Sequence, residues 1–320
     1  MTKRITFAGL AASAAITALM LSACGGQSTT TGTNEEGGLT GAVTADGSST
    51  VAPLTEAAAD QFRDVEAGIN VTVATSGTGG GFAAFCAGET DISNASRAIS
   101  DEEIALCEEN GIDYTEIVMA NDGLSVVVPL ENDWAECLTV EQLATIWGPE
   151  SEGEITNWNQ VDPSFPDEEL ALFGAGTDSG TFDYFTDAIN GEEGAIRTDY
   201  SPSEDDNITI QGVSGAAGGI GFLGLSYVEE NADVIKAVAV DGGAGCVEAN
   251  VETVQSGEYT PLSRPLFIYV ANESYTGNEA VKTFVDYYVE NAGSIAEDAV
   301  FVPLTDEQVA TAADELASLG

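Results

Sequence analysis

Strand patterns and helical patterns alternate along this chain from Gly41 to its C-terminus, and this alternation most restricts the folds that it can adopt. Strands are predicted where apolar residues alternate or run together, and helices where they recur every three or four positions. The clearest strands are residues 69–73, 124–129 and 266–270, and the clearest helices are residues 139–147 and 278–291. Such alternation is typical of an α/β fold with largely parallel sheets. The 320 residues suffice for two domains of about 100–200 residues each.

The charge balance excludes several classes of function. The chain has 54 Asp and Glu against 8 Lys and Arg, no His, and a formal net charge of −46. Without His there can be no Ser–His–Asp triad and no His-bearing zinc site. No segment has the spacing of a calcium loop, so we expect neither a metal nor a cofactor. A surface this negative repels phosphate backbones, which argues against nucleic acid as a partner.

The N-terminus has the pattern of an export signal. Lys3 and Arg4 precede an apolar run over residues 5–21, which ends in the tetrad LSAC at Cys24. The tetrad resembles a bacterial lipobox, in which the cysteine carries the lipid (palmitate among its acyl groups) after cleavage. We therefore expect a signal peptide at residues 1–23, a flexible tether at residues 24–40, and an extracytoplasmic body anchored to the cell membrane by lipid. A retained transmembrane helix is the alternative, for which the apolar run is short.

Four further cysteines follow, an even number in an exported chain, which favours disulfides over free thiols. Four cysteines allow three pairings, and zinc binding is the competing interpretation, although no CxxC spacing is present. We favour one bond that brackets a short helical stretch and a second that joins distant segments. These pairs are Cys86–Cys107 and Cys137–Cys246.

Glycine and hydroxyl residues cluster at four points where a strand is expected to give way to a helix. Such a segment offers backbone N–H groups, hydroxyl donors and the positive end of a helix dipole to a small anion. One such segment would usually be no more than a helix N-cap, but four in one chain suggest a shared site. The segments are residues 46–53, 75–82, 93–97 and 176–182.

Arg97 is a candidate anion ligand because cations are so scarce, with an ion pair to a nearby carboxylate as the alternative. Arg264 is assigned a structural role at a crossover between domains. The GxGxxG motif at residues 219–224 lacks a clear preceding strand, so we discount it as a nucleotide site. Neither Ser179 nor Ser214 lies in a GxSxG elbow.

Taken together, these segments resemble a known family. They resemble, in order and behind a lipobox, the phosphate-binding subunits of phosphate-specific ABC transporters, from about residue 41 to the end of the chain. The segments that carry the resemblance are GSSTV, SGTGGGF, FCAGETDISNASR, TNWNQV, GTDSGTFDYF, VSGAAGGIGFLGLSYV and PLSRPLFIYV. The resemblance implies a type II periplasmic-binding-protein fold with the ligand in a cleft between two domains. It places domain 1 at residues 41–128 plus 267–320, and domain 2 at residues 129–266.

The resemblance also implies a set of phosphate ligands. Some family members have an Asp near the position of Arg97 and an Arg in the loop before the SGT motif, whereas residues 173–178 contain no Arg here. The cation and the carboxylate would then have exchanged sides of the cleft, with Asp178 as the acceptor. A carboxylate accepts the proton of monohydrogen phosphate but repels sulfate. The implied ligands are Ser49, Thr50, Ser76, Gly77, Arg97, Asp178, Ser179, Gly180 and Thr181.

The function expected from these features is extracytoplasmic capture of inorganic phosphate and its delivery to the membrane permease of an ABC transporter. The protein would act as a monomer and not as an enzyme. One alternative is a binding protein for another tetrahedral oxyanion, such as sulfate or molybdate. More distant alternatives are a phosphatase or esterase that uses Ser179, and a surface protein without a ligand.

Overall fold

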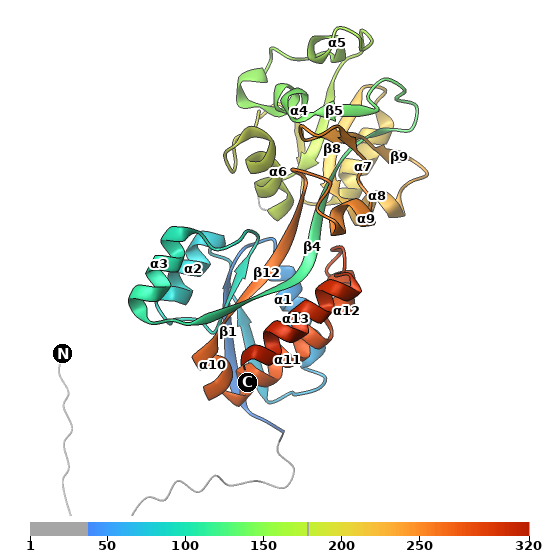
Figure 1. Ribbon diagram of the computed structural model, residues 1–320. Coiled ribbons are helices and arrows are strands. Elements are labelled where there is room, and N and C mark those ends of the chain that lie inside the picture. Colours follow the sequence, from blue (N-terminus) through green and yellow to red (C-terminus); the bar gives the residue numbers. More distant parts are fainter. Residues whose placement is uncertain (1–37, 178, 320) are drawn as a thin grey trace, which may run out of the picture. The chain divides into compact units, whose positions relative to one another are not determined.

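The computed structural model describes residues 38–177 and 179–319. The predicted signal peptide, Cys24, most of the predicted tether and Asp178 therefore lie outside the described residues. The expected α/β class is confirmed, because strands and helices alternate along the described chain (Figure 1). All five segments singled out from the sequence have the expected type. They lie in strands β2 (Ile69–Val73), β4 (Tyr114–Pro129) and β12 (Ser263–Ala271), and in helices α4 (Val140–Trp147) and α11 (Glu279–Glu290).

The hydrophobic core has two parts, one on each side of the molecule's middle. The first part includes strands β1 (Gly41–Gly47), β2 and β3 (Ile92–Ala95), together with halves of β4 and β12. Successive β12 residues alternate between its two faces: Leu266, Ile268 and Val270 face one layer of helices, and Phe267 and Tyr269 face the other. The helices of this part are α1 (Ala52–Phe62), α2 (Thr78–Cys86), α3 (Asp101–Asn110), α10 (Asn272–Gly277), α11, α12 (Ala292–Asp298) and α13 (Asp306–Leu319).

The second part of the core is built from the middle of the chain. Its strands continue the same sheet through β8 (Gly219–Gly224), β6 (Ala171–Ala175) and β7 (Ser201–Ser203), with β9 (Ile235–Ala237) paired to β4. A three-stranded sheet of β11 (Cys246–Val247), β10 (Ala239–Asp241) and β5 (Cys137–Thr139) covers it. The helices are α4, a short 3₁₀ turn at Pro149–Ser151, α5 (Trp158–Val161), α6 (Gly180–Asn190), α7 (Asp206–Gly215), α8 (Leu225–Glu230) and α9 (Val251–Gln255).

Two long strands, β4 and β12, connect the two parts of the core and lie side by side (Figure 1). They are antiparallel to each other, and β4 is also antiparallel to β8 and β9. The expectation of largely parallel sheets is therefore wrong at the centre of the molecule. The physical reason is that the chain crosses once along β4 and returns along β12, so the two crossing strands must run in opposite directions. The domain boundaries at residues 128/129 and 266/267 stay a prediction.

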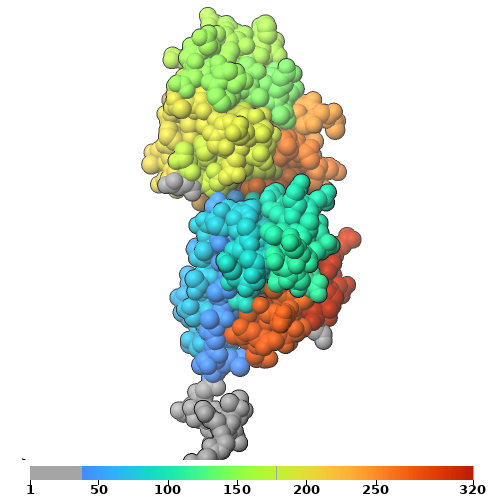
Figure 2. All heavy atoms as spheres, turned by 90° about the vertical axis from the view of Figure 1, so that its left-hand side faces the viewer, coloured from blue at the N-terminus to red at the C-terminus, as the bar shows by residue number. Residues whose placement is uncertain are grey.

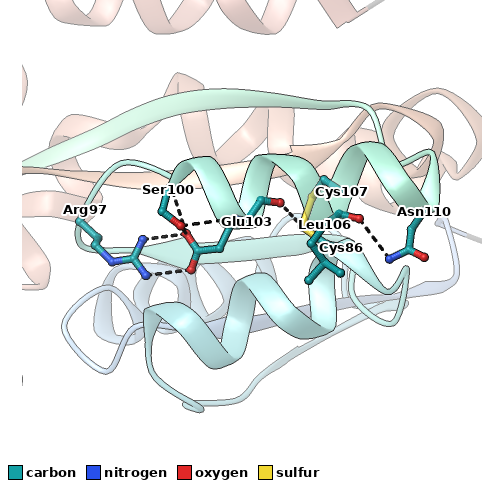
Figure 3. The surroundings of a disulfide bond; sticks show 7 residues. All are labelled: Cys86, Arg97, Ser100, Glu103, Leu106, Cys107 and Asn110. Carbon is teal, nitrogen blue, oxygen red and sulfur yellow. Dashed lines mark hydrogen bonds and ion pairs between the residues drawn. A yellow bond between two sulfur atoms is a disulfide. The ribbon is translucent and has the colours of Figure 1, made fainter.

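The structure contains both disulfides in the pairing that we favoured. Cys86 and Cys107 have their Cα atoms 4.3 Å apart and join α2 to α3 (Figure 3). Cys137 and Cys246 have their Cα atoms 6.0 Å apart and join β5 to β11. The discounted GxGxxG segment forms strand β8 itself, so it is not the turn between a strand and a helix that a nucleotide site requires. Among the described residues, no helix has the length and apolar character needed to cross a bilayer.

Helix α6 is held in place by an aromatic cluster in the second part of the core. The rings of Phe185 and Phe222 stack with their centroids 3.9 Å apart. The indole of Trp147 meets both rings edge-on, at centroid distances of 5.7 and 5.1 Å. All three side chains are fully buried. Because α6 begins with Gly180, this cluster fixes the place of the predicted SGT segment.

We predict that Phe185→Ala lowers the free energy of unfolding by about 3–5 kcal/mol, because it removes a buried ring and leaves a cavity. Urea denaturation followed by tryptophan fluorescence measures this loss. The matched control is Ile208→Ala, whose side chain is 57% exposed, for which the change should stay within about 0.5 kcal/mol. A Phe185→Ala protein as stable as this control would show that the cluster does not anchor α6.

Candidate functional site

A cleft of about 1160 Å³ opens where several helices begin. Strands β2, β1 and β3 are parallel neighbours, so their carboxyl ends lie at one edge of the sheet. The segments that follow them line one wall of the cleft, and α6 with the loop after it lines the other. Figure 2 shows the face on which the blue-to-teal part of the chain meets the yellow part. The first wall comprises residues 48–50, 75–79 and 96–98.

The first wall is tied together by Asp46, at the end of β1. Its Oδ1 accepts hydrogen bonds from the backbone N–H of Gly47, at 2.8 Å, and of Ser76, at 3.0 Å. Gly47 has a φ of +141°, and a Cβ there would lie 2.1 Å from the carbonyl oxygen of Asn94. Only glycine fits this position. Three turns from different parts of the chain are therefore held at one edge of the sheet.

The second wall begins at Ser179, the N-cap of α6, whose Oγ accepts a hydrogen bond from the backbone N–H of Thr181. Hydroxyl groups of the first wall reach across to it. The Oγ1 of Thr50 donates to the carbonyl of Gly180, and the Oγ of Ser49 donates to Oδ2 of Asp183, both at 3.4 Å. A Cβ on Gly180 would lie 2.4 Å from the Thr50 hydroxyl oxygen, so this approach requires glycine.

The structure brings together most of the residues that we predicted to bind the ligand. Ser49, Thr50, Ser76, Gly77 and Arg97 line the cleft. The start of α6 lies next to it through the contact of Thr50 with Gly180. The side chain of Ser179 is used as a helix cap, and Thr181 lines a smaller cavity of about 180 Å³. Their roles as ligands stay a prediction.

Arg97 lines the cleft and also forms the ion pair that was the alternative interpretation (Figure 3). Its two terminal nitrogens donate to the two carboxylate oxygens of Glu103, each at 2.8 Å, and Nη1 also donates to the carbonyl of Ala98. Burial would raise the pKa of Glu103, but the hydrogen bonds from Arg97 and Ser100 outweigh it and lower the pKa. The same carboxylate closes the capping box of α3 with Ser100.

Sequence reasoning missed the place of Arg264 in this site. The sequence predicts only a structural role for it, and it does pair with Asp122, but it also lines the cleft. Asp122 is buried, and this burial raises its pKa although Arg264 opposes the effect. Arg264 could have been predicted from the observation that indicated Arg97. Cations are scarce in this chain, so each arginine next to a small-residue segment is a candidate anion ligand.

The second wall also carries three carboxylates that the sequence did not single out, those of Asp183, Asp187 and Glu193. Burial raises the pKa of Asp183, and the negative charge of Glu193 raises it further. The hydrogen bond from Ser49 and the charge of Arg264 act in the opposite direction. The cleft therefore combines two guanidinium groups with three carboxylates, of which Asp183 has a raised pKa.

Comparison with known proteins identifies the family. Residues 27–292 match the family model of a PBP superfamily domain. Protein SphX from Synechocystis sp. is 48% identical over 261 residues, which are 82% of this chain and 78% of that protein. The phosphate-binding protein PstS from Staphylococcus saprophyticus is 38% identical over 287 residues, which are 89% and 86% of the two chains. The chain belongs to the PstS family of phosphate-binding proteins.

A solved structure agrees with this membership and with the predicted fold. The crystal structure of a possible phosphate binding protein from Planctomyces limnophilus is similar, with a TM-score of 0.84 and 42% sequence identity. The match covers 88% of this chain and 99% of that one. The two-domain periplasmic-binding-protein fold expected for a PstS family member is thus confirmed.

We predict that Asp183→Asn raises the melting temperature at pH 7. For a carboxyl group whose pKa is raised by folding, the stability contribution is fully present below the unfolded pKa of about 3.9, and it is lost as the pH rises through the folded pKa. The amide keeps an acceptor for Ser49 and carries no charge. The gain should shrink as the pH falls toward about 4, as scanning calorimetry would show. The exposed Asp64→Asn variant removes the same charge and should give a smaller gain at pH 7.

Proposed function

We propose that this protein captures inorganic phosphate outside the cytoplasm and delivers it to the permease of an ABC transporter. The observation that carries the proposal is the convergence of hydroxyl-bearing helix starts and two arginines on one cleft, in a member of the PstS family. Helix N-termini and hydroxyl groups suit a small oxyanion, because they present donors without bulk.

The ligand set that we propose has two sides. The first wall supplies the hydroxyl groups of Ser49, Thr50 and Ser76, the backbone at Gly77, and the charge of Arg97. The second supplies Ser179, Gly180 and Thr181 at the start of α6, with Asp178 as an acceptor. Micromolar binding needs about 8 kcal/mol. Hydrogen bonds to a charged ligand contribute about 1.5–3 kcal/mol each, so a handful of them is sufficient.

A carboxylate in the cleft favours phosphate over sulfate or molybdate. Monohydrogen phosphate carries a proton that it can donate to a carboxylate oxygen, whereas a fully ionised oxyanion can only be repelled. Asp183 is a carboxylate of the second wall that already accepts a hydrogen bond from Ser49 of the first wall. It can serve this purpose beside, or in place of, Asp178.

We predict that titration of the purified protein with inorganic phosphate at pH 7 gives saturable heat with a dissociation constant in the micromolar range or below. Sulfate and molybdate should bind at least about tenfold more weakly, because they lack a proton to donate. Ser76→Ala should weaken phosphate binding, and Ser214→Ala, which changes a hydroxyl in α7, should not. Absence of heat with phosphate, or turnover of a chromogenic phosphate ester that Ser179→Ala abolishes, would contradict the proposal.

We also propose that the protein reaches its permease as a lipoprotein. Export and lipidation at Cys24 would keep the binding cleft within reach of the membrane, with residues 24–40 as the tether. Expressed in a bacterium with its own leader, the protein should fractionate with membranes and incorporate labelled palmitate. Cys24→Ser should abolish the label and release the protein from the membrane, while Cys86→Ser, which breaks a disulfide instead, should leave the label in place.

A further inference from the structure

Arg264 occupies a position that no other cation of the described chain shares. It is the second residue of β12, directly opposite Asp122 of β4 in the register of the two crossing strands. Its side chain is 17% exposed and lines the cleft. It therefore lies between the two parts of the core, at the floor of the candidate site.

The guanidinium group is fixed from three directions. Its Nε donates to Oδ2 of Asp122 at 3.2 Å, and Nη2 donates to Oγ1 of Thr50 at 3.1 Å. Its central carbon lies 3.6 Å from the centre of the Tyr184 ring, so the planar group stacks on an aromatic face. The hydroxyl of Tyr184 in turn donates to the carbonyl of Pro261 at 2.7 Å, which holds the ring in place.

This arrangement leaves donors unused. A guanidinium has five N–H groups, of which one goes to Asp122 and one to Thr50. Among the described residues, Nη1 has no hydrogen-bond acceptor. Arg97 differs, because both of its terminal nitrogens already donate to Glu103 and its side chain is 47% exposed. Three N–H groups of Arg264, among them both of Nη1, thus have no acceptor among the described residues, against two of the more exposed Arg97.

Arg264 also sets the direction in which the hydroxyl of Thr50 can donate its hydrogen. Because the Thr50 oxygen accepts from Arg264, its hydrogen must point elsewhere, and it now points to the carbonyl of Gly180 on the opposite wall. A ligand held at the start of α1 and α6 would lie beside this hydroxyl and within reach of the guanidinium. Asp122, Arg264, Thr50 and Gly180 form one chain of hydrogen bonds from the crossing strands to both walls.

We propose that Arg264 is a direct ligand of the bound oxyanion, supplying it with N–H donors and positive charge from the floor of the cleft, with Asp122 and Tyr184 as its positioning residues. This inference rests on the proposed phosphate binding. It gives the crossing strands a part in ligand recognition, since a second positive charge, beside that of Arg97 on the first wall, would meet the anion from β12.

The test compares four proteins by calorimetric titration with inorganic phosphate, with circular dichroism to establish folding. Arg264→Gln should weaken phosphate binding by about 100-fold, the loss expected when a buried charged partner is removed. The double variant Arg264→Gln/Asp122→Asn leaves no unpaired buried charge and should weaken binding as much. Arg63→Gln, which removes an exposed cation next to α1, should bind as the unmodified protein does.

The outcomes separate this inference from the proposed function. If the double variant recovers the affinity of the unmodified protein, the guanidinium acts only by neutralising Asp122, and the inference is wrong. It is equally wrong if folded Arg264→Gln binds phosphate within about threefold of the unmodified protein, far less than a charged contact contributes. If the unmodified protein itself binds no phosphate, the proposed function fails. If Arg264→Gln does not fold, the double variant decides the matter alone.

Discussion

The antiparallel pairing of β4 with β12 is the interaction on which the rest of the structure depends. It extends from Ser263 opposite Gly123 to Ala271 opposite Tyr114, with one irregularity between Leu266 and Phe267. Strand β4 contributes buried residues to both parts of the core, and β12, buried in the first part, follows directly after Leu262 of the second, so the ladder joins the two parts. Because its hydrogen bonds are perpendicular to the strands, the ladder fixes the register at which the walls of the cleft face each other.

The scarcity of positive charge makes the position of each cation informative. Beyond the predicted signal peptide the chain has six cations against 54 acidic residues in all. Arg197 is buried and donates to Asp199 and to two backbone carbonyls, which makes it a structural tie. Arg63 and Lys282 form ion pairs with helical neighbours. Two of the remaining three, Arg97 and Arg264, line the same cleft, so two of the chain's few cations lie where an anion would enter.

The sequence was sufficient to predict the first wall of the site, because its chemistry is local. A strand that ends in glycine and hydroxyl residues before a helix has that character whatever surrounds it, as at Ser49 and Ser76. The place of Arg264 in the cleft could not be predicted in this way, because it depends on contacts with Asp122, 142 positions away, and with Tyr184. The carboxylate of Asp183 was missed for the same reason. The antiparallel centre of the sheet likewise follows from the path of the chain and not from any strand's own pattern.

The strong negative charge of the chain explains why the site relies on short-range contacts. The net charge of −46 opposes the approach of any anion, but in salt solution this repulsion is screened beyond about 10 Å. What decides binding is therefore the environment within a few ångströms of the ligand. There the cleft offers fixed donors from helix starts, hydroxyl groups and a guanidinium stacked on Tyr184. Such groups are already oriented before the ligand arrives, so little of the binding energy is lost in ordering them. A strongly acidic protein can thus bind a dianion, because the few groups that attract the ligand lie next to it and are already oriented.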